Sequence, residues 1–476
     1  MTTRHNNFIN GSPTPPSNGT YADLIDPCTG NPFAAVARSG EADIEAAFEA
    51  AADAFTVWSA QSPGRRQRAL LSVADIIDDN AALLAAIESS NTGKPLVPTR
   101  TDEIAIAADV IRYFAGAARA TFTPSAGNYL PGHMSYVLRE PIGVCAQMVP
   151  FNYPLLMAVW KFAPALAAGN TVVLKPSHNT PLSMLALAEL TAGCLPPGTI
   201  NVVCGDRTAT AGITSHPTAR HISATASTAS GIAIATSALG DVKRLHLGLG
   251  GKSPALVFAD ADIEHTARRL AHAAYSNGGQ DCTAASRILV DAAIHDRFAA
   301  EFIDRATQLV TADPRSRPDA FYGPLNSLGQ LERIRRALEK LPPHAEVSTG
   351  SEVPDSTGYF QPPTIVTGVT TDDSIVREEL FGPVVTIETF SGIDDAVRTA
   401  NIADYGLASS VHTRDHDIAM RTSAALDYGC VWVNTHLPLA SEMPHGGFKQ
   451  SGFGKDLSSY GLEEFTRIKH VMHCTS

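Results

Sequence analysis

Short apolar runs rich in valine and isoleucine alternate with longer Ala/Leu-rich amphipathic segments along most of this chain. Strand-like runs at 143–150 and 170–177 flank an apolar segment at 154–168 that has the length of a helix. Two further strand-like runs follow at 199–205 and 221–227. A strand period that alternates with a helical period is typical of a parallel sheet covered by helices. The pattern therefore predicts an α/β fold with a doubly wound sheet, which binds ligands at the carboxyl ends of its strands.

A second α/β unit is predicted to begin near Lys252. Its first strand-like runs, 253–260 and 286–291, enclose an amphipathic helix at 262–276. The chain is therefore expected to form two sheet-and-helix units in succession. Later strand-like runs are at 364–369, 383–390 and 430–435, and early helices are predicted at 42–58, 65–89 and 102–119.

Two segments fall outside this alternation. Residues 127–141 are predicted to form a β-hairpin, and the run TRIKHVMHC at 466–474 is predicted to be a strand without a local partner. Strands with unpaired edges are often completed by another subunit. We therefore expect a homo-oligomer, either a homodimer or a homotetramer.

Composition and charge narrow the classes of function. The 476-residue chain is 44% hydrophobic and 18% charged, which is typical of a globular protein. Its net charge of −12 and its lack of a Lys/Arg cluster argue against binding to nucleic acid. No apolar run reaches the ~18 residues that a membrane span needs, since Lys161 interrupts the best one. The N-terminal segment is polar and lacks the apolar core of a signal peptide, so we expect a cytoplasmic protein with a small-molecule partner.

One of the seven cysteines has a context that favours chemistry. The cysteines are scattered, odd in number and never spaced as CxxC, which argues against a disulfide framework or a cysteine zinc site. The histidines show no metal-ligand spacing either, so we expect no metal. A lone cysteine is usually a buried structural residue, but Cys282 lies within SNGGQDCTAASR at 276–287. The two glycines just before it indicate a tight turn that presents the thiol, which makes Cys282 the candidate nucleophile.

Seven motifs along the chain carry a family resemblance. They are PFNYP (150–154), LKPS (174–177), LGGKSP (249–254), GQDC (279–282), EELFGPV (378–384), YGLASSV (405–411) and HGGFKQSGFGKD (445–456). On these motifs the chain resembles the NAD(P)-dependent aldehyde dehydrogenase superfamily from about Asp26 to the C-terminus. Within that superfamily, GQDCTAASR, GCVWVNTH and SEMPHGG most resemble γ-aminobutyraldehyde dehydrogenases, which act on ω-aminoaldehydes.

The resemblance implies the aldehyde dehydrogenase fold. This fold combines a Rossmann-like nucleotide-binding domain, an α/β catalytic domain that carries Cys282, and a small β oligomerisation domain. The nucleotide-binding domain is expected at 1–122 and 142–249, the catalytic domain at 250–449, and the oligomerisation domain at 123–141 and 450–476.

The resemblance also implies a covalent mechanism. The thiolate of Cys282 is expected to attack the aldehyde carbonyl, while the side-chain amide of Asn152 and the backbone N–H of Cys282 stabilise the oxyanion. Hydride then passes to the nicotinamide of NAD or NADP and leaves a thioester on Cys282. The residues expected to bind the cofactor are Lys175 (adenosine ribose), Ser227 (pyrophosphate, at a helix start), Glu379 (nicotinamide ribose), Phe381 (beside the nicotinamide ring), Phe151, Ser177 and His178.

Four positions depart from the pattern of the family. Gly248 replaces the glutamate before LGGK, the general base that activates water against the thioester, a role worth ~10²–10⁴-fold in rate. His178 replaces a carboxylate that would bind the adenosine ribose, which leaves both NAD and NADP open. Ala226 places a methyl group where glycine lets the backbone approach the cofactor. Phe151 occupies a position often filled by tryptophan.

Two explanations of these departures remain open. In the first, the chain oxidises an aldehyde and either Asp456 or Asp281 activates water, or the acyl group leaves to a thiol or an amine, as in acyl-transferring or reducing relatives. In the second, the chain is a pseudoenzyme or a binding or assembly subunit. The first explanation is favoured because the chain retains Cys282, Asn152, Lys175, Glu379 and Phe381.

The favoured hypothesis is NAD(P)-dependent oxidation of a small aldehyde, with an ω-aminoaldehyde such as 4-aminobutyraldehyde as the candidate substrate. A carboxylate near the cavity would stabilise the ammonium group of such a substrate. Asp109, Asp281 and Glu442 are the candidates, although each also fits an ordinary solvated charge.

Overall fold

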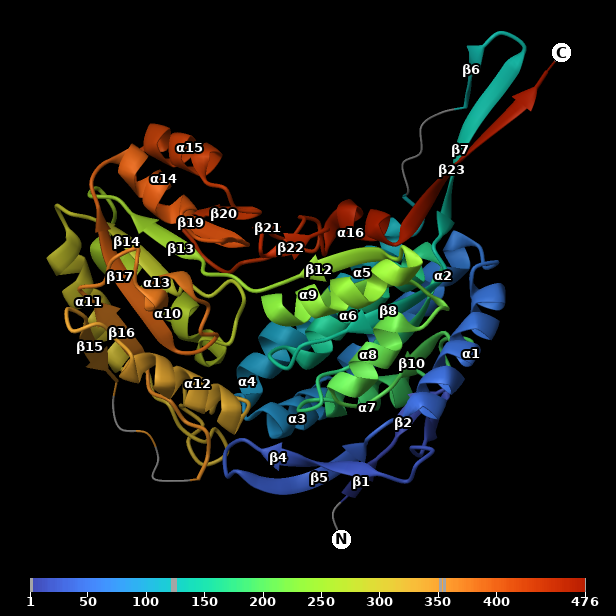
Figure 1. Cartoon of the computed structure of the whole chain (residues 1–476), viewed down its shortest axis with the longest axis horizontal. Coiled ribbons are helices and arrows are strands. Elements are labelled where there is room, and N and C mark those ends of the chain that lie inside the picture. The colour runs from blue at the N-terminus through green and yellow to red at the C-terminus, as the bar shows by residue number, and fades with distance from the viewer. Residues whose placement is uncertain (1–2, 121–125, 351–352, 354–356, 476) are drawn as a thin grey trace.

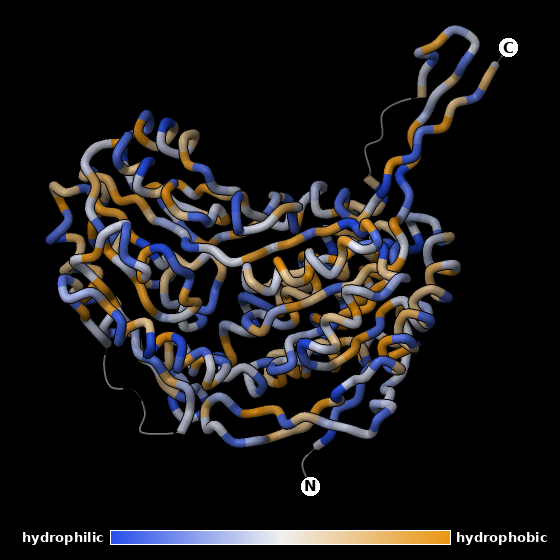
Figure 2. The backbone as a smooth tube through the Cα atoms, in the orientation of Figure 1, coloured by the Kyte–Doolittle hydropathy of each residue, from blue (hydrophilic) through white to orange (hydrophobic). Residues whose placement is uncertain are grey.

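The computed structural model describes residues 3–120, 126–350, 353 and 357–475. Two large sheets covered by helices form the body of the protein, and a narrow three-stranded sheet projects from it (Figure 1). Apolar stretches concentrate in the strands and helices of the body (Figure 2). These features confirm the predicted α/β fold class. The predicted domain boundary at 122–123 lies outside the described residues.

The first large sheet consists of β2 (Asn7–Ile9), β3 (Ser12–Thr14), β8 (Val144–Met148), β9 (Thr171–Lys175), β10 (Ile200–Val202), β11 (Ala219–Thr225), β12 (Arg244–Gly248) and β22 (Gly452–Phe453). Their order is β22-β12-β11-β8-β9-β10-β2-β3, and the strands from β12 to β10 run parallel. Every residue of β8 and β9 is buried, because helices cover both faces of a parallel sheet. The doubly wound sheet predicted from the alternating pattern is confirmed.

Helix α6 (Pro154–Ala168) follows β8 and is buried on nearly all of its sides. A proline fits the first position of a helix, since its missing N–H has no partner to lose there. Gly169 ends the helix with a φ of +98°, which a residue without Cβ adopts freely. The helix therefore begins directly after residues 149–153 and fixes that loop at the carboxyl edge of the sheet.

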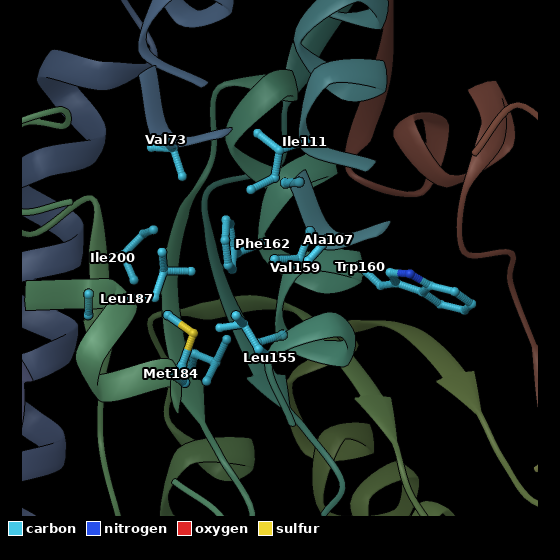
Figure 3. Packing of buried hydrophobic residues seen from close by; sticks show 14 of the residues in the cluster. Val73, Ala107, Ile111, Leu155, Val159, Trp160, Phe162, Met184, Leu187 and Ile200 are labelled. Atoms are coloured by element: carbon cyan, nitrogen blue, oxygen red, sulfur yellow. The ribbon is translucent and has the colours of Figure 1, made fainter. Parts of the chain in front are cut away.

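The packing of α6 holds the helix in place and, with it, the loop at 149–153. Leu155, Val159 and Phe162 contact the neighbouring helices in one apolar cluster, which Figure 3 shows from close by. Trp160 belongs to the same helix, but its indole ring points away from the other labelled side chains (Figure 3). Helix α6 thus packs into the core on nearly all of its sides, and the ring of Trp160 points to a different side from Leu155, Val159 and Phe162.

The predicted helix at 65–89 is two helices, α2 (Pro63–Asp79) and α3 (Ala81–Thr92). Asn80 separates them, because its backbone N–H and its side-chain Nδ2 both donate to the carbonyl oxygen of Ile76. Asparagine competes for backbone groups in this way and therefore favours helix ends. The prediction of one continuous helix is wrong for this reason.

The other helices of the first unit confirm the predicted helical segments, with small shifts at their ends. The predicted helix at 102–119 is a π-helical turn followed by the shorter α5. No helix in the described part of the chain is long and apolar enough to span a bilayer. The other helices of the first unit are α1 (Glu41–Trp58), α4 (Leu96–Pro98), η1 (Thr99–Ile104), α5 (Ala105–Ala117), α7 (Leu182–Leu190), α8 (Arg207–Ser215), α9 (Thr228–Ala238) and η2 (Leu239–Asp241).

The second large sheet consists of β13 (Pro254–Val257), β14 (Arg287–Asp291), β15 (Glu346–Thr349), β16 (Thr364–Thr367), β17 (Val384–Phe390), β19 (Ala408–His412) and β20 (Cys430–Val433). Their order is β15-β16-β17-β14-β13-β19-β20, and only β15 pairs antiparallel among these described strands. The second predicted α/β unit is confirmed. Its helices are α10 (Ile263–Tyr275), η3 (Ser276–Gly279), α11 (His295–Thr307), α12 (Leu328–Glu339), α13 (Ser374–Arg377), α14 (Ile393–Asn401) and α15 (His416–Ala425).

The C-terminal strand finds its partner within its own chain. β23 (Thr466–Cys474) pairs antiparallel with β7 (His133–Pro141) along its whole length, and β7 also pairs with β6 (Gly127–Leu130). The predicted hairpin is thus confirmed, and the strand predicted to lack a local partner pairs with this distant hairpin of the same chain. The reason is tertiary: β22 and α16 (Ser458–Glu464) lead the chain back along the first unit to the hairpin (Figure 1).

The N-terminal strands were not predicted from the sequence. β1 (Thr3–His5), β4 (Tyr21–Asp26) and β5 (Asn31–Ala37) form a separate sheet, while β2 joins the first large sheet. Several of these strands are short and rich in polar residues, so the apolar pattern does not indicate them. The fully buried Asn7 is an example. Its Oδ1 accepts hydrogen bonds from the backbone N–H of Cys204 and the hydroxyl of Ser39, both at 2.9 Å. Tertiary contacts therefore pair the side-chain oxygen of this buried residue, whereas its Nδ2 is buried without a hydrogen-bond partner. A short pair, β18 (Tyr405–Gly406) and β21 (Phe448–Lys449), completes the sheets of the described residues.

The buried ion pair between Arg287 and Glu388 should be the most sensitive polar contact of the second sheet. Arg287 is fully buried on β14, and its Nε and Nη2 donate to the two carboxylate oxygens of Glu388 at 2.7 and 2.9 Å. We expect Arg287→Met to lower the free energy of unfolding by about 3–5 kcal/mol, because it leaves an unpaired carboxylate in the interior. The urea midpoint measures this effect. The double variant Arg287→Met/Glu388→Leu should recover most of the loss, and an unchanged midpoint in the single variant would contradict the assignment.

Candidate active site

A cavity of about 1880 Å³ lies where the two large sheets face each other. Met148 at the end of β8, Lys175 at the end of β9, Ala226 after β11 and Leu249 after β12 line it, together with Cys282 from the second unit. This is the edge at which a doubly wound sheet binds ligands. The cavity therefore lies where the sequence predicts it. The predicted site residues that line it are Asp109, Phe151, Asn152, Lys175, Ser177, His178, Ser227, Asp281, Cys282, Glu379, Phe381 and Glu442.

Cys282 lies in a loop that three residues with left-handed backbone bend sharply. Asn277, Gly278 and Gly279 have φ values of +52°, +62° and +66° just before it. A Cβ on Gly279 would lie 2.4 Å from the carbonyl oxygen of Gly382, so only glycine fits there. The predicted tight turn is confirmed. Backbone conformation, not side-chain packing, thus brings Cys282 to the cavity wall.

Asn152 lies beside the loop of Cys282 and is buried. Its Nδ2 donates to the carbonyl oxygen of Gln280 at 3.0 Å, which leaves the second N–H of the amide for a ligand oxygen. The backbone carbonyl oxygen of Asn152 accepts hydrogen bonds from Lys94 Nζ and Asn277 Nδ2, both at 3.0 Å. These contacts fix the backbone of Asn152 at the cavity edge, and the amide can serve as the oxyanion donor that the resemblance implies.

Three buried charged side chains lie beside Asn152, and one of them, Lys94, donates to its backbone oxygen. Lys94 forms ion pairs with Glu88 at 3.3 Å and with Glu103, and all three residues are buried. Burial raises the pKa of Glu103 to about 8, against the opposing charge of Lys94. Glu88 also accepts the backbone N–H of Leu155 at the start of α6. Nothing in the spacing of these residues along the chain indicates that they meet, so sequence reasoning missed them.

Asp281 was predicted as a substrate contact and as a substitute base, but both of its carboxylate oxygens have partners. Oδ1 accepts from the backbone N–H and the hydroxyl of Thr283 at 2.6 and 2.7 Å, and Oδ2 accepts from the hydroxyl of Tyr153 at 2.8 Å. Burial, and then the negative charges of Asp281 and Glu379, raise the pKa of the Cys282 thiol well above its ordinary value. Cys282 is therefore a protonated thiol at neutral pH, so its proton must leave before or during attack.

Glu379 and Phe381 lie across the cavity from the first sheet. Glu379 Oε1 accepts the backbone N–H of Gly251 at 2.9 Å. A Cβ on Gly250 would lie 2.1 Å from Glu379 Oε2, so that glycine makes room for the carboxylate. Phe381 has a φ of +58°, and its ring meets that of Phe151 edge to face with centroids 5.7 Å apart. The two aromatic rings thus bound the middle of the cavity.

Positive charge gathers at the end of the cavity beside β9. Lys175 is buried, its Nζ donates to the carbonyl oxygen of Pro176 at 2.8 Å, and burial lowers its pKa to about 8. The side chains of His178 and Arg207 line the same end. Asp206, the nearest carboxylate that acts on Lys175, already forms an ion pair with Arg38 at 3.0 Å. This end can therefore accept an anionic group, and Arg207 is a contributor that the motifs did not reveal.

Gly248 ends β12 beside the cavity. A Cβ there would lie 3.4 Å from Thr225 Oγ1, 3.5 Å from Asp456 Oδ2 and 3.9 Å from Lys161 Nζ, which are ordinary contact distances. Lys161 Nζ donates to both carboxylate oxygens of Asp456 at 2.9 Å, and both residues are buried. Burial by itself would raise the pKa of Asp456, but the charges of Lys161 and His246 outweigh it and hold the pKa below its ordinary value.

The opposite end of the cavity is acidic and partly aromatic. Asp109 and Glu442 are exposed at its mouth, and Asp109 Oδ2 accepts the hydroxyl of Ser441 at 2.7 Å. The indole ring of Trp160 and the imidazole ring of His445 also line the cavity, edge to face with centroids 5.4 Å apart. Sequence reasoning proposed the two carboxylates but gave no role to Trp160 or His445.

The residues of the cavity fit the nicotinamide dinucleotide that the resemblance implies. Its volume exceeds the range of about 300–1,000 Å³ that is typical of small-molecule pockets. Ser227 caps α9, whose N-terminal N–H groups can bind a pyrophosphate, and the cradle at Gly250 would be filled by any Cβ. The methyl group of Ala226 lines this cradle, while its N–H donates to the carbonyl oxygen of Gly248 at 3.1 Å. Within the described ranges, no three His, Cys, Asp or Glu side chains are placed to hold a metal ion.

Comparisons with known proteins agree with this geometry. Residues 14–471 match the model of the aldehyde dehydrogenase family. The chain is 40% identical to an aldehyde dehydrogenase of Aspergillus niger over 98% of its own length and 94% of the relative. It is 39% identical to a betaine aldehyde dehydrogenase of Bacillus subtilis (strain 168), over 98% and 97% of the two chains. The crystal structure of a betaine aldehyde dehydrogenase from Staphylococcus aureus in complex with NAD⁺ superposes with a TM-score of 0.96 at 34% identity, covering 99% of this chain and 95% of that one.

Alkylation of Cys282 should reveal its raised pKa. Because the thiolate is the reactive form, we expect the rate with iodoacetamide in the cofactor-free protein to climb through pH 9 without a plateau below it. Asp281→Asn removes the negative charge nearest the thiol, lowers its pKa and should speed alkylation at pH 8 by about threefold or more. Peptide mass spectrometry separates Cys282 from the exposed Cys474, which serves as the internal reference. A plateau near neutral pH would contradict the assignment.

Proposed function

The chain belongs to the aldehyde dehydrogenase family, and we propose that it oxidises a small cationic aldehyde, an ω-aminoaldehyde such as 4-aminobutyraldehyde, with NAD or NADP. The observation that carries this proposal is that Cys282, the basic side chains of Lys175 and Arg207, and the carboxylates of Asp109 and Glu442 line one cavity. The betaine aldehyde dehydrogenases among the relatives act on an aldehyde that carries a quaternary ammonium, which supports a cationic substrate.

The proposed reaction begins at Cys282. Its sulfur attacks the aldehyde carbonyl as the thiol loses its proton, and the free N–H of Asn152 together with the backbone N–H of Cys282 stabilises the oxyanion of the thiohemiacetal. A bound nicotinamide supplies the hydride acceptor. Glu379, Phe381 and Phe151 bound the space in which that ring would lie. Loss of hydride leaves an acyl group on Cys282.

Removal of the acyl group is the proposed slow step. Gly248 has no side chain, and a group there would reach the buried pair of Lys161 and Asp456. The missing carboxylate would otherwise withdraw a proton from the attacking water, which is worth ~10²–10⁴-fold in rate. We therefore expect the acyl-enzyme to accumulate during turnover.

We also propose that the site accepts NADP as well as NAD. The family provides NAD-bound structures, and the basic end of this cavity adds Lys175, His178 and Arg207 where a 2′-phosphate would lie. Three positively charged or proton-accepting groups with no unpaired carboxylate beside them favour a phosphate. His178 stands where a carboxylate would repel that group.

The projecting sheet of β6, β7 and β23 is proposed to mediate the assembly of a homodimer or homotetramer. Its strands expose apolar side chains, among them Leu138, Ile468 and Met472 at 41%, 67% and 46%. Exposed apolar groups on a narrow sheet are typical of an interface. The division into nucleotide-binding, catalytic and oligomerisation domains remains part of this proposal.

Rapid mixing tests the proposed reaction. With 4-aminobutyraldehyde and either NAD or NADP, we expect a burst of reduced cofactor that is stoichiometric with Cys282, followed by slow turnover. Gly248→Glu should raise the slow phase by about 10²-fold because it restores a base, and Cys282→Ala should abolish the burst. Acceleration of the slow phase by an added thiol would instead support the acyl-transferring alternative. The absence of a burst with several aldehydes and both cofactors would support a pseudoenzyme or binding protein.

The acidic mouth of the cavity should select for charge. Asp109→Asn and Glu442→Gln should each raise the KM for 4-aminobutyraldehyde by about 2–5-fold, the effect of one exposed ion pair. The KM for butyraldehyde, which has the same chain length without the ammonium, is the matched control and should not change. Equal effects on both substrates would mean that these carboxylates do not contact the ammonium group.

A further inference from the structure

The acyl-enzyme needs a base, and Asp281 and Asp456 are both engaged in other contacts. Asp281 accepts three hydrogen bonds from Thr283 and Tyr153. Asp456 is held by Lys161 through both oxygens, with a pKa below its ordinary value, so it is a weak base. These are the two groups that the sequence offered as substitutes for the missing glutamate at position 248. Asp281 is held by its three hydrogen bonds and Asp456 by its ion pair with Lys161.

Glu379 is also poorly placed for this role. Its Oε1 accepts the backbone N–H of Gly251, and its Oε2 lies against Gly250 in the cradle for the nicotinamide end of the cofactor. His436 lines the cavity too, but its Nδ1 contacts the hydroxyl of Ser410 at 2.8 Å and its Nε2 contacts the carbonyl oxygen of Thr283 at 2.7 Å. An imidazole that bonds through both nitrogens cannot accept a further proton from water.

His445 differs from all of these groups. It is 5% exposed, it lines the cavity, and its Nδ1 is buried without a hydrogen-bond partner. Its backbone pairs with that of Asp456 in both directions, at 2.9 and 2.7 Å. Asp456 Oδ2 also lies 3.5 Å from the position of a Cβ on Gly248. The backbone of His445 is therefore paired with a residue that lies beside the position of the missing glutamate.

His445 and Cys282 line the same cavity and share two charged neighbours. The carboxylates of Asp281 and Asp456 act on the pKa of both residues. A second buried atom without a partner, Thr225 Oγ1, lies 3.4 Å from the position of a Cβ on Gly248. A water molecule that fills the space left by glycine therefore has polar groups to bind, as a buried water requires.

We propose that His445 is the general base that activates water for deacylation of Cys282, in place of the absent glutamate at position 248. This inference rests on the proposed function, because it requires the acyl-enzyme on Cys282. The imidazole of His445 takes one proton from the water as the water oxygen bonds to the thioester carbon. The tetrahedral intermediate then collapses, the C–S bond breaks, and the sulfur leaves as the thiolate. The carboxylic acid product loses its proton to solvent, and the imidazolium returns its proton to the thiolate.

The surroundings keep His445 in the neutral form that a base needs. Burial lowers its pKa below the ordinary 6.5, and the positive charges of Lys455 and Lys161 act in the same direction. Asp456 and Asp281 oppose them but do not reverse the shift. A base works only when unprotonated, so kcat should fall as the pH drops through the lowered pKa and should be constant above it.

The test combines rapid mixing with a conservative variant. His445→Asn keeps a polar nitrogen near the position of Nδ1 but cannot take a proton. We expect the burst of reduced cofactor to keep its amplitude, the steady-state rate to fall by about 10²-fold, and the acid limb of the pH profile of kcat to disappear. His272→Asn is the matched control, since this exposed histidine also lines the cavity, where its ring contacts the hydroxyl of Ser276 at 3.3 Å and the ring of Phe321.

Rescue distinguishes catalysis from damage to the fold. Adding Gly248→Glu to His445→Asn should restore the steady-state rate, which a misfolded site would not allow. An unchanged rate and pH profile in His445→Asn would overturn the inference and leave the proposed function intact. A slow phase that survives His445→Asn but is lost in Asp456→Asn, with the burst intact, would likewise overturn it in favour of Asp456. A wild-type protein without any burst would overturn the proposed function and this inference with it.

Discussion

The ammonium of Lys161 and the carboxylate of Asp456 meet in the interior of the protein, and the active site depends on this contact. Lys161 comes from α6 beneath the first sheet, whereas Asp456 comes from the C-terminal segment that returns to the first unit after the second sheet. Loss of one partner would leave a buried charge, at about 3–5 kcal/mol. The pair therefore joins the segments that carry Asn152, Gly248 and His445, and it also keeps Asp456 from acting as a strong base.

Charge along the cavity follows the chemistry that the family performs. The basic end beside β9 suits the phosphates of a dinucleotide, and the acidic mouth suits a cationic aldehyde. Cys282 lies between them, where burial and neighbouring carboxylates raise its pKa and keep the thiol protonated at neutral pH. In the proposed reaction, this difference in charge would separate the dinucleotide from the cationic aldehyde. The replacement of glutamate by Gly248 changes only the last stage of this arrangement.

The strands and helices of the two large units could be predicted because their apolar runs alternate with amphipathic segments of helical length. The prediction failed where local pattern and tertiary contact disagree. Asn80 divides one predicted helix because its side chain competes for a backbone carbonyl. Asn7 lies in a buried strand, where a distant backbone N–H and a distant hydroxyl donate to its side-chain oxygen. The terminal strand pairs with β7, more than 300 positions earlier in the chain, which no local pattern encodes.

The sequence by itself determined the family and predicted Cys282 as the nucleophile and Gly248 in place of a glutamate, because ordered motifs and a glycine-rich turn are local properties. Only the tertiary structure decided which groups could replace that glutamate. In the sequence, Asp281 and Asp456 were candidates for this role. In the folded chain their carboxylate oxygens are paired with Thr283, Tyr153 and Lys161. No role for His445 followed from the sequence, and folding left its buried Nδ1 without a partner in the cavity wall. Basicity depends on burial and on partners, and these are properties of the folded chain.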